Sequence, residues 1–314
     1  MTALPALQDA IKQFLQHLKS ERQLSPLTVK HYQRDLQQLV SYCQQAEISQ
    51  WQRVDSHHIR SFINQLHRRG SGPRSLQRLL SACRTFFNYL IRERQLSNNP
   101  AIAIKAPKTP HRLPKTLNVD EVNQLLTPND DTDSPIALRD FAMMELMYSS
   151  GLRLAELITL NINSIDSASQ EVTATGKGRK QRIVPVGSVA IKAIQCWLKV
   201  RNDWVNTATD SALFISQRGK RISARSVQAR MALWGQQQGL GAKLNPHKLR
   251  HSFATHVLES SGDIRAVQEM LGHANLSTTQ IYTHLDFQHL AKVYDAAHPR
   301  SKLKSKTANK QKAP

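Results

Sequence analysis

One stretch near the C-terminal end gathers groups that could act on a phosphate. Residues 246–286, PHKLRHSFATHVLESSGDIRAVQEMLGHANLSTTQIYTHLD, include His247, Arg250, His273 and Tyr282. Guanidinium groups are planar and permanently charged, so two of them can grip the non-bridging oxygens of a phosphodiester. On a helix, His247 and Arg250 are three positions apart and share a face, so one phosphate can meet both. These residue types predict a site that holds an anion while Tyr282 attacks it.

Tyr282 is the predicted nucleophile of this site. A phenol has a reference pKa of about 10 and is mostly protonated at neutral pH, so it needs help. Neighbouring cations both stabilise the phenolate and neutralise the phosphate that it attacks. The attack would form a 3′-phosphotyrosine and release a 5′-hydroxyl group. Because this linkage preserves the bond energy, a second 5′-hydroxyl could reverse the step on another strand without ATP or a metal.

Two upstream segments carry further cations. Arg153 lies in SGLRLAEL, directly after a predicted helix that Gly151 closes. Lys177 lies in TGKGRKQR, in the glycine-flanked turn of a hairpin predicted from the alternation in QEVTATGKGRKQRIVPV. A simple exposed turn lysine is the competing interpretation of Lys177.

Together these segments resemble the tyrosine recombinase (phage integrase) family. The family pattern is an early arginine, a hairpin lysine, H-x-x-R, a later histidine and a nucleophilic tyrosine. The sequence fills every position of it, with Arg153, Lys177, His247, Arg250, His273 and Tyr282. The resemblance implies that Lys177 is the general acid for the departing 5′ oxygen. It also implies that His273 hydrogen-bonds the phosphate or assists proton transfer, and that no cofactor is needed.

The segments LGHANLSTTQIYTH and PHKLRHSFATH look closest to those of bacterial family members that resolve chromosome dimers at cell division. This resemblance implies that the protein acts on double-stranded DNA with a second, related recombinase, two subunits of each. A division-associated DNA translocase would control the reaction. It further implies that the helix after Tyr282 docks into a neighbouring subunit. The alternative is that its apolar stripe packs on its own domain, and the stripe comprises Leu285, Leu290, Val293 and Tyr294.

The elements that must position these residues are mostly helical. Apolar residues recur at helical spacing through residues 1–95, which predicts a helical DNA core-binding domain. Four prolines predict a linker over 96–115. Residues 116–298 read as an α+β catalytic domain with a small β-hairpin sheet, and 299–314 as a basic, disordered tail. The predicted fold class is mainly α.

Two more local expectations accompany this division. Ser25 and Pro26 are expected to begin a helix, as its N-cap and first residue. A second hairpin is expected in ALFISQRGKRIS, residues 212–223.

Charge indicates the partner. The chain has 43 Lys and Arg against 23 Asp and Glu, a net charge of +20. Such an excess favours a polyanion, because each neutralised phosphate releases counterions. A membrane surface is the alternative, but no apolar run approaches the roughly 20 residues of a spanning helix. The N-terminal segment lacks the pattern of a secretory signal, and the three cysteines form no CxxC pair, so we expect a cytoplasmic protein.

Rival functions fit the sequence less well. His247 and His251 have the spacing of a helical zinc pair, but there is no HExxH motif and no third ligand at a predictable offset. GKGRK lacks the strand–loop–helix context of a nucleotide-binding loop. A non-catalytic DNA-binding protein would explain the charge but not the six filled positions. A mobile-element integrase remains an alternative, although such proteins often carry an additional arm-binding domain.

Overall fold

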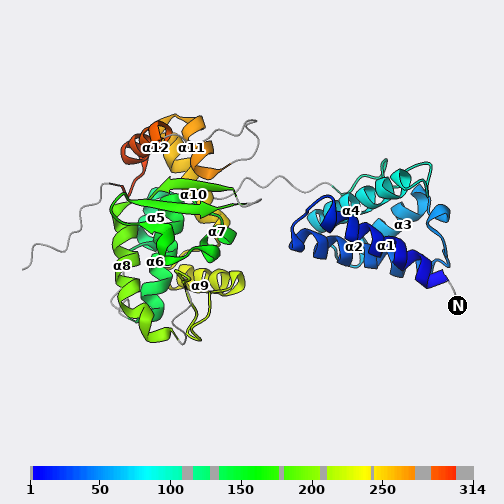
Figure 1. The fold of residues 1–314 in the computed structure, drawn as a ribbon, viewed down its shortest axis with the longest axis horizontal. Coiled ribbons are helices and arrows are strands. Elements are labelled where there is room, and N and C mark those ends of the chain that lie inside the picture. Colours follow the sequence, from blue (N-terminus) through cyan, green and yellow to red (C-terminus); the bar gives the residue numbers. More distant parts are fainter. Residues whose placement is uncertain are drawn as a thin grey trace, which may run out of the picture. The chain divides into compact units, whose positions relative to one another are not determined.

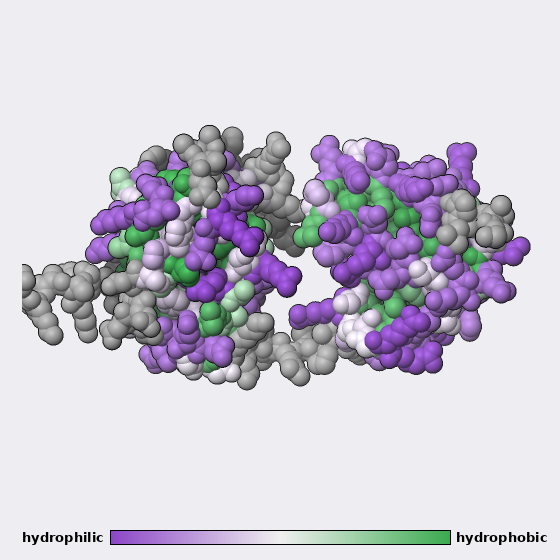
Figure 2. Space-filling view, turned by 90° about the horizontal axis from the view of Figure 1, so that it is seen from below, coloured by the Kyte–Doolittle hydropathy of each residue, from purple (hydrophilic) through white to green (hydrophobic). Residues whose placement is uncertain are grey.

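A computed structural model describes residues 3–107, 116–127, 134–176, 180–205, 211–241, 244–272 and 284–301. The chain forms two compact units, Met1–Arg112 and Leu113–Pro314 (Figure 1). Each unit encloses a hydrophobic core of its own. None of the described helices combines the length and apolarity needed to cross a membrane. Hydrophilic side chains cover most of the coloured surface in Figure 2.

The first unit is a helical bundle whose helix ends follow the sequence signals. Ser25 accepts a hydrogen bond from the backbone N–H of Thr28, and Pro26 is the first helical residue, as predicted. Asp55 and His58 form a reciprocal capping box. The described helices are α1 (Ala3–Ser20), α2 (Pro26–Gln45), η1 (Trp51–Arg53), α3 (Ser56–Arg68) and α4 (Pro73–Arg92).

The start of the segment expected to be a linker packs against this bundle. Ala101 and Ile104 are buried in the helical core. Arg84 of α4 donates to Ala101 O at 3.0 Å and also to Ile104 O. Asn99 donates to Arg84 O at 3.0 Å. The apolar side chains and the satisfied carbonyls together hold these turns on the bundle.

The second unit is mainly helical with one small sheet. Its helices are α5 (Val119–Leu125), α6 (Pro135–Ser150), α7 (Leu154–Thr159), η2 (Ile162–Ser164), α8 (Ser188–Arg201), η4 (Asn202–Trp204), α9 (Ala224–Gln237), α10 (Pro246–Ser261), α11 (Ile264–Leu271) and α12 (His284–Ala297). Helix α6 is buried along almost all of its length, and α8 and α10 both pack on it (Figure 1). The predicted fold class, mainly α with an α+β catalytic domain, is confirmed.

The sheet contains the predicted hairpin. Its strands are β1 (Ile165–Asp166), β2 (Glu171–Thr175) and β3 (Gln181–Pro185), antiparallel in the order β1-β2-β3. Thr173 pairs with Ile183 at the centre of the β2–β3 ladder. The turn residues 177–179 lie outside the described residues. The second expected hairpin is present in a short form. Ile215 and Arg221 form one antiparallel bridge, and Ser216 N donates to Lys220 O at 2.8 Å and Ile222 N to Phe214 O at 3.0 Å.

Helix α12 packs on its own unit. Leu290 and Tyr294 are buried in the same core as α6. The Tyr294 hydroxyl lies 2.6 Å from Ser149 Oγ, which also accepts the backbone N–H of Gly187 at 2.7 Å. Arg300, just beyond the helix, forms a buried ion pair with Glu145 of α6. For Leu290, Val293 and Tyr294 this is the packing on its own domain that the sequence left open as an alternative, and docking of the helix into a neighbouring subunit stays a prediction.

His298 is a buried residue that its neighbours hold in the neutral form. Its Nε2 lies 3.3 Å from Tyr148 O, and its Nδ1 accepts the Arg300 backbone N–H at 3.2 Å. A proton on Nδ1 would oppose that donor. Burial, together with the charge of Arg300, lowers the pKa of His298 to about 3.

We expect this pKa to make the second unit acid-sensitive. The unfolded chain takes up a proton near the ordinary pKa of 6.5, and the folded chain only near 3, so stability falls as pH drops through this window. By pH 5 the effect reaches about 2 kcal/mol. Denaturant unfolding at pH 7 and pH 5 should therefore show that His298→Gln loses less free energy of unfolding between the two pH values than the unmodified chain does.

The comparison of the two proteins isolates His298 from its neighbours. Burial raises the pKa of Glu145 to about 7, which acts in the opposite direction, with stability falling as pH rises from about 4.5 to 7. That contribution is common to both proteins. Equal losses of unfolding free energy between pH 7 and pH 5 would contradict the prediction.

Candidate active site

Arg153 is positioned by a sharp turn between two helices. Helix α6 ends at Gly151, whose φ of 58° lies in the left-handed region, and Arg153 is the N-cap residue of α7. A Cβ atom at position 151 would lie 2.6 Å from Cε1 of Phe253, closer than such atoms approach. Only glycine satisfies both the backbone angle and this contact. The glycine therefore brings Arg153 close to helix α10.

Arg250 reaches the same turn from α10. Asn245 caps that helix and Pro246 begins it, which sets the register of the residues that follow. The buried Arg250 guanidinium donates to Gly151 O and, at 2.7 Å, to Leu271 O. His247, one turn earlier on α10, is exposed.

Glu156 of α7 joins two arginines. Its Oε1 accepts from Arg153 Nη1 at 2.9 Å and from Arg182 Nη1 at 2.6 Å. Its Oε2 accepts from the Arg153 backbone N–H at 2.8 Å and from Arg182 Nη2 at 2.9 Å. The Glu156 and Arg182 side chains are 2% and 7% exposed, whereas Arg153 is 40% exposed. Of these three residues, only Arg153 is exposed enough to be reached by a ligand from the solvent.

The C-terminal end of α11 accepts from all three arginines. Arg182 Nε donates to Met270 O at 3.0 Å, Arg250 Nη2 to Leu271 O at 2.7 Å, and Arg153 Nη2 to Gly272 O at 2.9 Å. These carbonyls have no partner within a helix that ends here, and they carry the negative end of its dipole. The end of α11 therefore holds three cations side by side.

The charges of this arginine cluster, which comprises Arg153, Arg182, Arg250 and Glu156, shift its ionisation equilibria. Burial, followed by the charge of Arg153, lowers the pKa of Arg250 to about 10, so it remains protonated at neutral pH. Burial raises the pKa of Glu156, but the hydrogen bonds and charges of Arg182 and Arg153 outweigh it and leave that pKa below the ordinary value. Three guanidinium groups and one carboxylate leave two positive charges. That excess suits an anion.

The structure thus brings two of the predicted residues, Arg153 and Arg250, to one turn, with His247 on the helix of Arg250. Lys177, His273 and Tyr282 lie outside the described residues. Sequence reasoning missed Glu156 and Arg182. The R-x-x-E spacing of a capping box could have indicated Glu156. Strand alternation could have indicated Arg182, because it shares the buried face of β3 with Val184.

Other histidines of the predicted stretch have structural surroundings. His256 is buried, and its Nδ1 lies 2.8 Å from the Tyr148 hydroxyl. His251 is exposed on α10. Among the described residues, no group of three or more His, Cys, Asp or Glu side chains is arranged to hold a metal ion.

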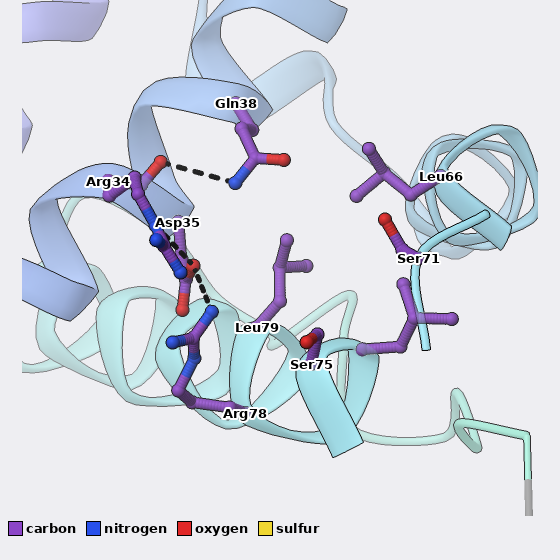
Figure 3. Close-up of a pocket in the computed structure, with 9 residues that line it drawn as sticks. Arg34, Asp35, Gln38, Leu66, Ser71, Ser75, Arg78 and Leu79 are labelled. Carbon is purple, nitrogen blue, oxygen red and sulfur yellow. Dashed lines mark hydrogen bonds and ion pairs between the residues drawn. The ribbon is translucent and has the colours of Figure 1, made fainter. Parts of the chain in front are cut away.

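The first unit has a polar groove between α2 and α4 with a volume of about 230 Å³ (Figure 3). Arg34, Gln38 and Ser75 line it, and Arg78 donates to the buried Asp35 at 2.8 Å. One Asp35 oxygen has no hydrogen-bond partner, and burial raises the pKa of this carboxyl group. The pair fixes Arg78 of α4 at the groove, opposite Arg34 of α2.

Comparisons with known proteins agree with these observations. Residues 115–289 match the phage integrase family, and residues 11–94 match the N-terminal SAM-like domain of phage integrases. The chain is 56% identical to "Tyrosine recombinase XerC" of Histophilus somni, over 94% of this chain and 98% of that protein. It is 52% identical to the protein of the same name from Escherichia coli O157:H7, over 93% and 97%.

A solved structure shares the fold. The post-cleavage complex of the XerH site-specific recombinase with a palindromic difH substrate aligns with a TM-score of 0.68 at 24% identity, over 91% of this chain and 84% of that one. By the family matches and the near-full-length relatives, the chain belongs to the phage integrase family and is a site-specific DNA recombinase of the tyrosine type.

Proposed function

We propose that the chain cuts and rejoins DNA through a 3′-phosphotyrosine formed by Tyr282. The observation that carries this proposal is the pair Arg153 and Arg250 at the end of α11, directly before the segment with His273 and Tyr282. Attack of the phenol oxygen on phosphorus forms the P–O bond to tyrosine and breaks the bond to the 5′ oxygen. Negative charge accumulates on the equatorial oxygens in between.

The arginine cluster is suited to that charge. Its two uncompensated positive charges are set in place by buried contacts before DNA arrives, so little reorganisation is needed during the reaction. Arg153 is exposed enough for a phosphate to approach, and Arg250 lies behind it. We assign these two guanidinium groups to the non-bridging oxygens.

The remaining predicted residues take the proton-transfer and orienting roles. We assign Lys177 as the general acid that protonates the departing 5′ oxygen. His247, exposed on the helix that carries Arg250, and His273, next after Gly272, would hydrogen-bond the phosphate or assist the proton on Tyr282. The return step uses the same groups in reverse.

Double-stranded DNA is the proposed partner of both units. In the first, residues 1–95, the side chains of Arg34 and Arg78 beside the polar groove would contact the phosphates of the duplex. This region has 14 Lys and Arg against 6 Asp and Glu, so its overall charge is positive. Residues 116–298 form the proposed catalytic domain. Within the linker 96–115 and the tail 299–314, the described ends pack on these domains, and the basic tail would add phosphate contacts.

The relatives named XerC support a finer assignment. We propose that the chain works in the cytoplasm with a XerD-like recombinase, two subunits of each, to resolve chromosome dimers at cell division. A division-associated DNA translocase would control the assembly. A mobile-element integrase is the second candidate within the same chemistry.

A nicked duplex carrying the recombination site tests the proposal. The nick lets a short fragment diffuse away after cleavage, so the covalent protein–DNA adduct accumulates. Mass spectrometry of the digested adduct should place the phosphodiester on Tyr282, and EDTA should leave the yield unchanged. An adduct on another residue, or a strict requirement for Mg²⁺, contradicts the mechanism. Faster recombination when a XerD-like protein is added would support the partner.

Replacing Lys177 by alanine should slow cleavage, and a substrate with a 5′-bridging phosphorothiolate should restore most of the rate. A sulfur leaving group departs without a proton, so it bypasses the general acid. Single-turnover cleavage of the oxygen and sulfur substrates measures both rates. Lys180, the next lysine of the hairpin, provides the control, because Lys180→Ala should cleave both substrates normally. If sulfur gives no rescue, Lys177 is not the acid.

A further inference from the structure

We propose that Arg182 is a positioning residue for the recombination reaction, which acts by sharing Glu156 with Arg153 and by fixing the end of α11. This inference rests on the proposed function, because it names what aims one of the phosphate-binding arginines. Arg182 lies on β3, outside the set of residues that would touch DNA. Its effect on the reaction would pass through Arg153.

The hydrogen bonds of Glu156 show how the sharing works. Each carboxylate oxygen accepts one bond from Arg182 and one from Arg153, so the negative charge is divided between two partners. Without Arg182, the carboxylate would face Arg153 alone in a buried environment, where charges interact strongly. Arg153 would then be drawn to Glu156, away from Gly272 O and from the phosphate.

Arg182 also holds the chain at the point where α11 ends. Its Nε donates to Met270 O at 3.0 Å. A Cβ atom at position 272 would lie 3.1 to 3.2 Å from Cδ, Nε and Cζ of Arg182, so the side chain packs closely on this left-handed glycine. The same glycine gives Arg153 its carbonyl partner and precedes His273. The Arg182 side chain therefore helps to fix two positions: that of Arg153, and that of Gly272, from which the chain leads on to His273 and Tyr282.

The net charge of the arginine cluster offers a test, because removing Glu156 together with Arg182 should restore the charge that the loss of Arg182 alone changes. The cluster holds two net positive charges with Arg182 and one without it. Arg182→Gln should therefore weaken cleavage, whereas Arg182→Gln combined with Glu156→Gln returns the count to two and removes the carboxylate that captures Arg153. Arg182→Lys keeps the charge but cannot reproduce the paired bonds together with the bond to Met270 O.

Single-turnover cleavage of the nicked duplex at saturating protein is the measurement, with half-site affinity and the thermal midpoint recorded for each variant. We expect Arg182→Gln to cleave about 100-fold more slowly with half-site affinity unchanged. The double variant should recover most of that loss, and Arg182→Lys should fall between.

Arg139→Gln is the matched control. Arg139 is equally buried, pairs with Asp140 at 2.7 Å and donates to Ile215 O at 3.1 Å, but it lies outside the cluster. It should lower the thermal midpoint and keep the cleavage rate below that midpoint. If Arg182→Gln cleaves like this control, or if the double variant is no faster than Arg182→Gln, Arg182 is structural only and the proposal is overturned.

A crystal structure of Arg182→Gln tests positioning without reference to cleavage. The Arg153 guanidinium should release Gly272 O and donate from its side-chain nitrogens to both oxygens of Glu156. If Arg153 keeps its bond to Gly272 O, the proposal fails regardless of the reaction. If the unmodified chain forms no adduct with DNA, the proposed function fails instead, and the position of Arg153 still decides the role of Arg182.

Discussion

Replacing Tyr282 by phenylalanine is expected to abolish the covalent protein–DNA adduct and to leave the affinity for a half-site nearly unchanged. The substitution removes one oxygen, which we assign as the nucleophile. Binding depends instead on many cations, because the net charge of +20 is spread over the chain. A denaturing gel of the nicked duplex measures the adduct, and a mobility shift at fixed salt measures the affinity.

Tyr294→Phe is the control for this experiment. Tyr294 is buried, and its hydroxyl bonds Ser149, so its loss should lower stability by about 1 kcal/mol without preventing cleavage. Burial raises the pKa of the Tyr294 hydroxyl, which makes it a poor nucleophile at neutral pH. If Tyr282→Phe still forms the covalent adduct at normal yield, Tyr282 is not the nucleophile. If only Tyr294→Phe loses the adduct, Tyr294 is the nucleophile instead.

Arg250→Gln is expected to slow cleavage by about 100- to 1,000-fold, equivalent to roughly 3 to 4 kcal/mol of lost transition-state stabilisation. Glutamine can still donate to Gly151 O, but it carries no charge toward the developing oxyanion. Half-site affinity should change little, because one buried cation contributes little to the total electrostatic attraction. Single-turnover rates at saturating protein separate these two effects.

The buried position of Arg250 requires a stability check. Its loss leaves Gly151 O or Leu271 O without a donor, so the thermal midpoint should fall, and rates are compared well below it. His251→Ala, at the next position on α10 and exposed, should cleave normally. A rate for Arg250→Gln within tenfold of normal would mean that the guanidinium only supports the fold.

Local signals in the sequence predicted the elements well where one residue decides the geometry. Ser25 and Pro26 begin α2, and Gly151 ends α6, because capping and left-handed backbone depend on residue type. The β2–β3 hairpin follows from strict alternation. The segment 212–223 also turns at a glycine and forms one bridge, but its first residues pair with another part of the unit instead of lengthening the hairpin. Ile162 N donates to Ser211 O, and Leu213 N donates to Leu160 O.

The site was predictable only in part for a related reason. Motif spacing identifies Arg153 and Arg250, which act through their own chemistry. Strand alternation places Arg182 on the buried face of β3, but the sequence does not show that it pairs with Glu156 and reaches the end of α11. The cis packing of α12 was likewise hidden, because an apolar stripe indicates that a face is covered and not which molecule covers it. Tertiary contacts decide both questions.

Gly151 has a consequence for how the protein can change by mutation. Two separate barriers oppose any side chain there, a left-handed backbone angle and the ring of Phe253. A smaller residue at position 253 would remove the second barrier and leave the first. A substitution at position 253 can therefore remove only part of the cost of Gly151→Ala, so second-site suppressors of this change should be rare and partial in genetic screens, whereas exposed positions such as His251 should tolerate many replacements.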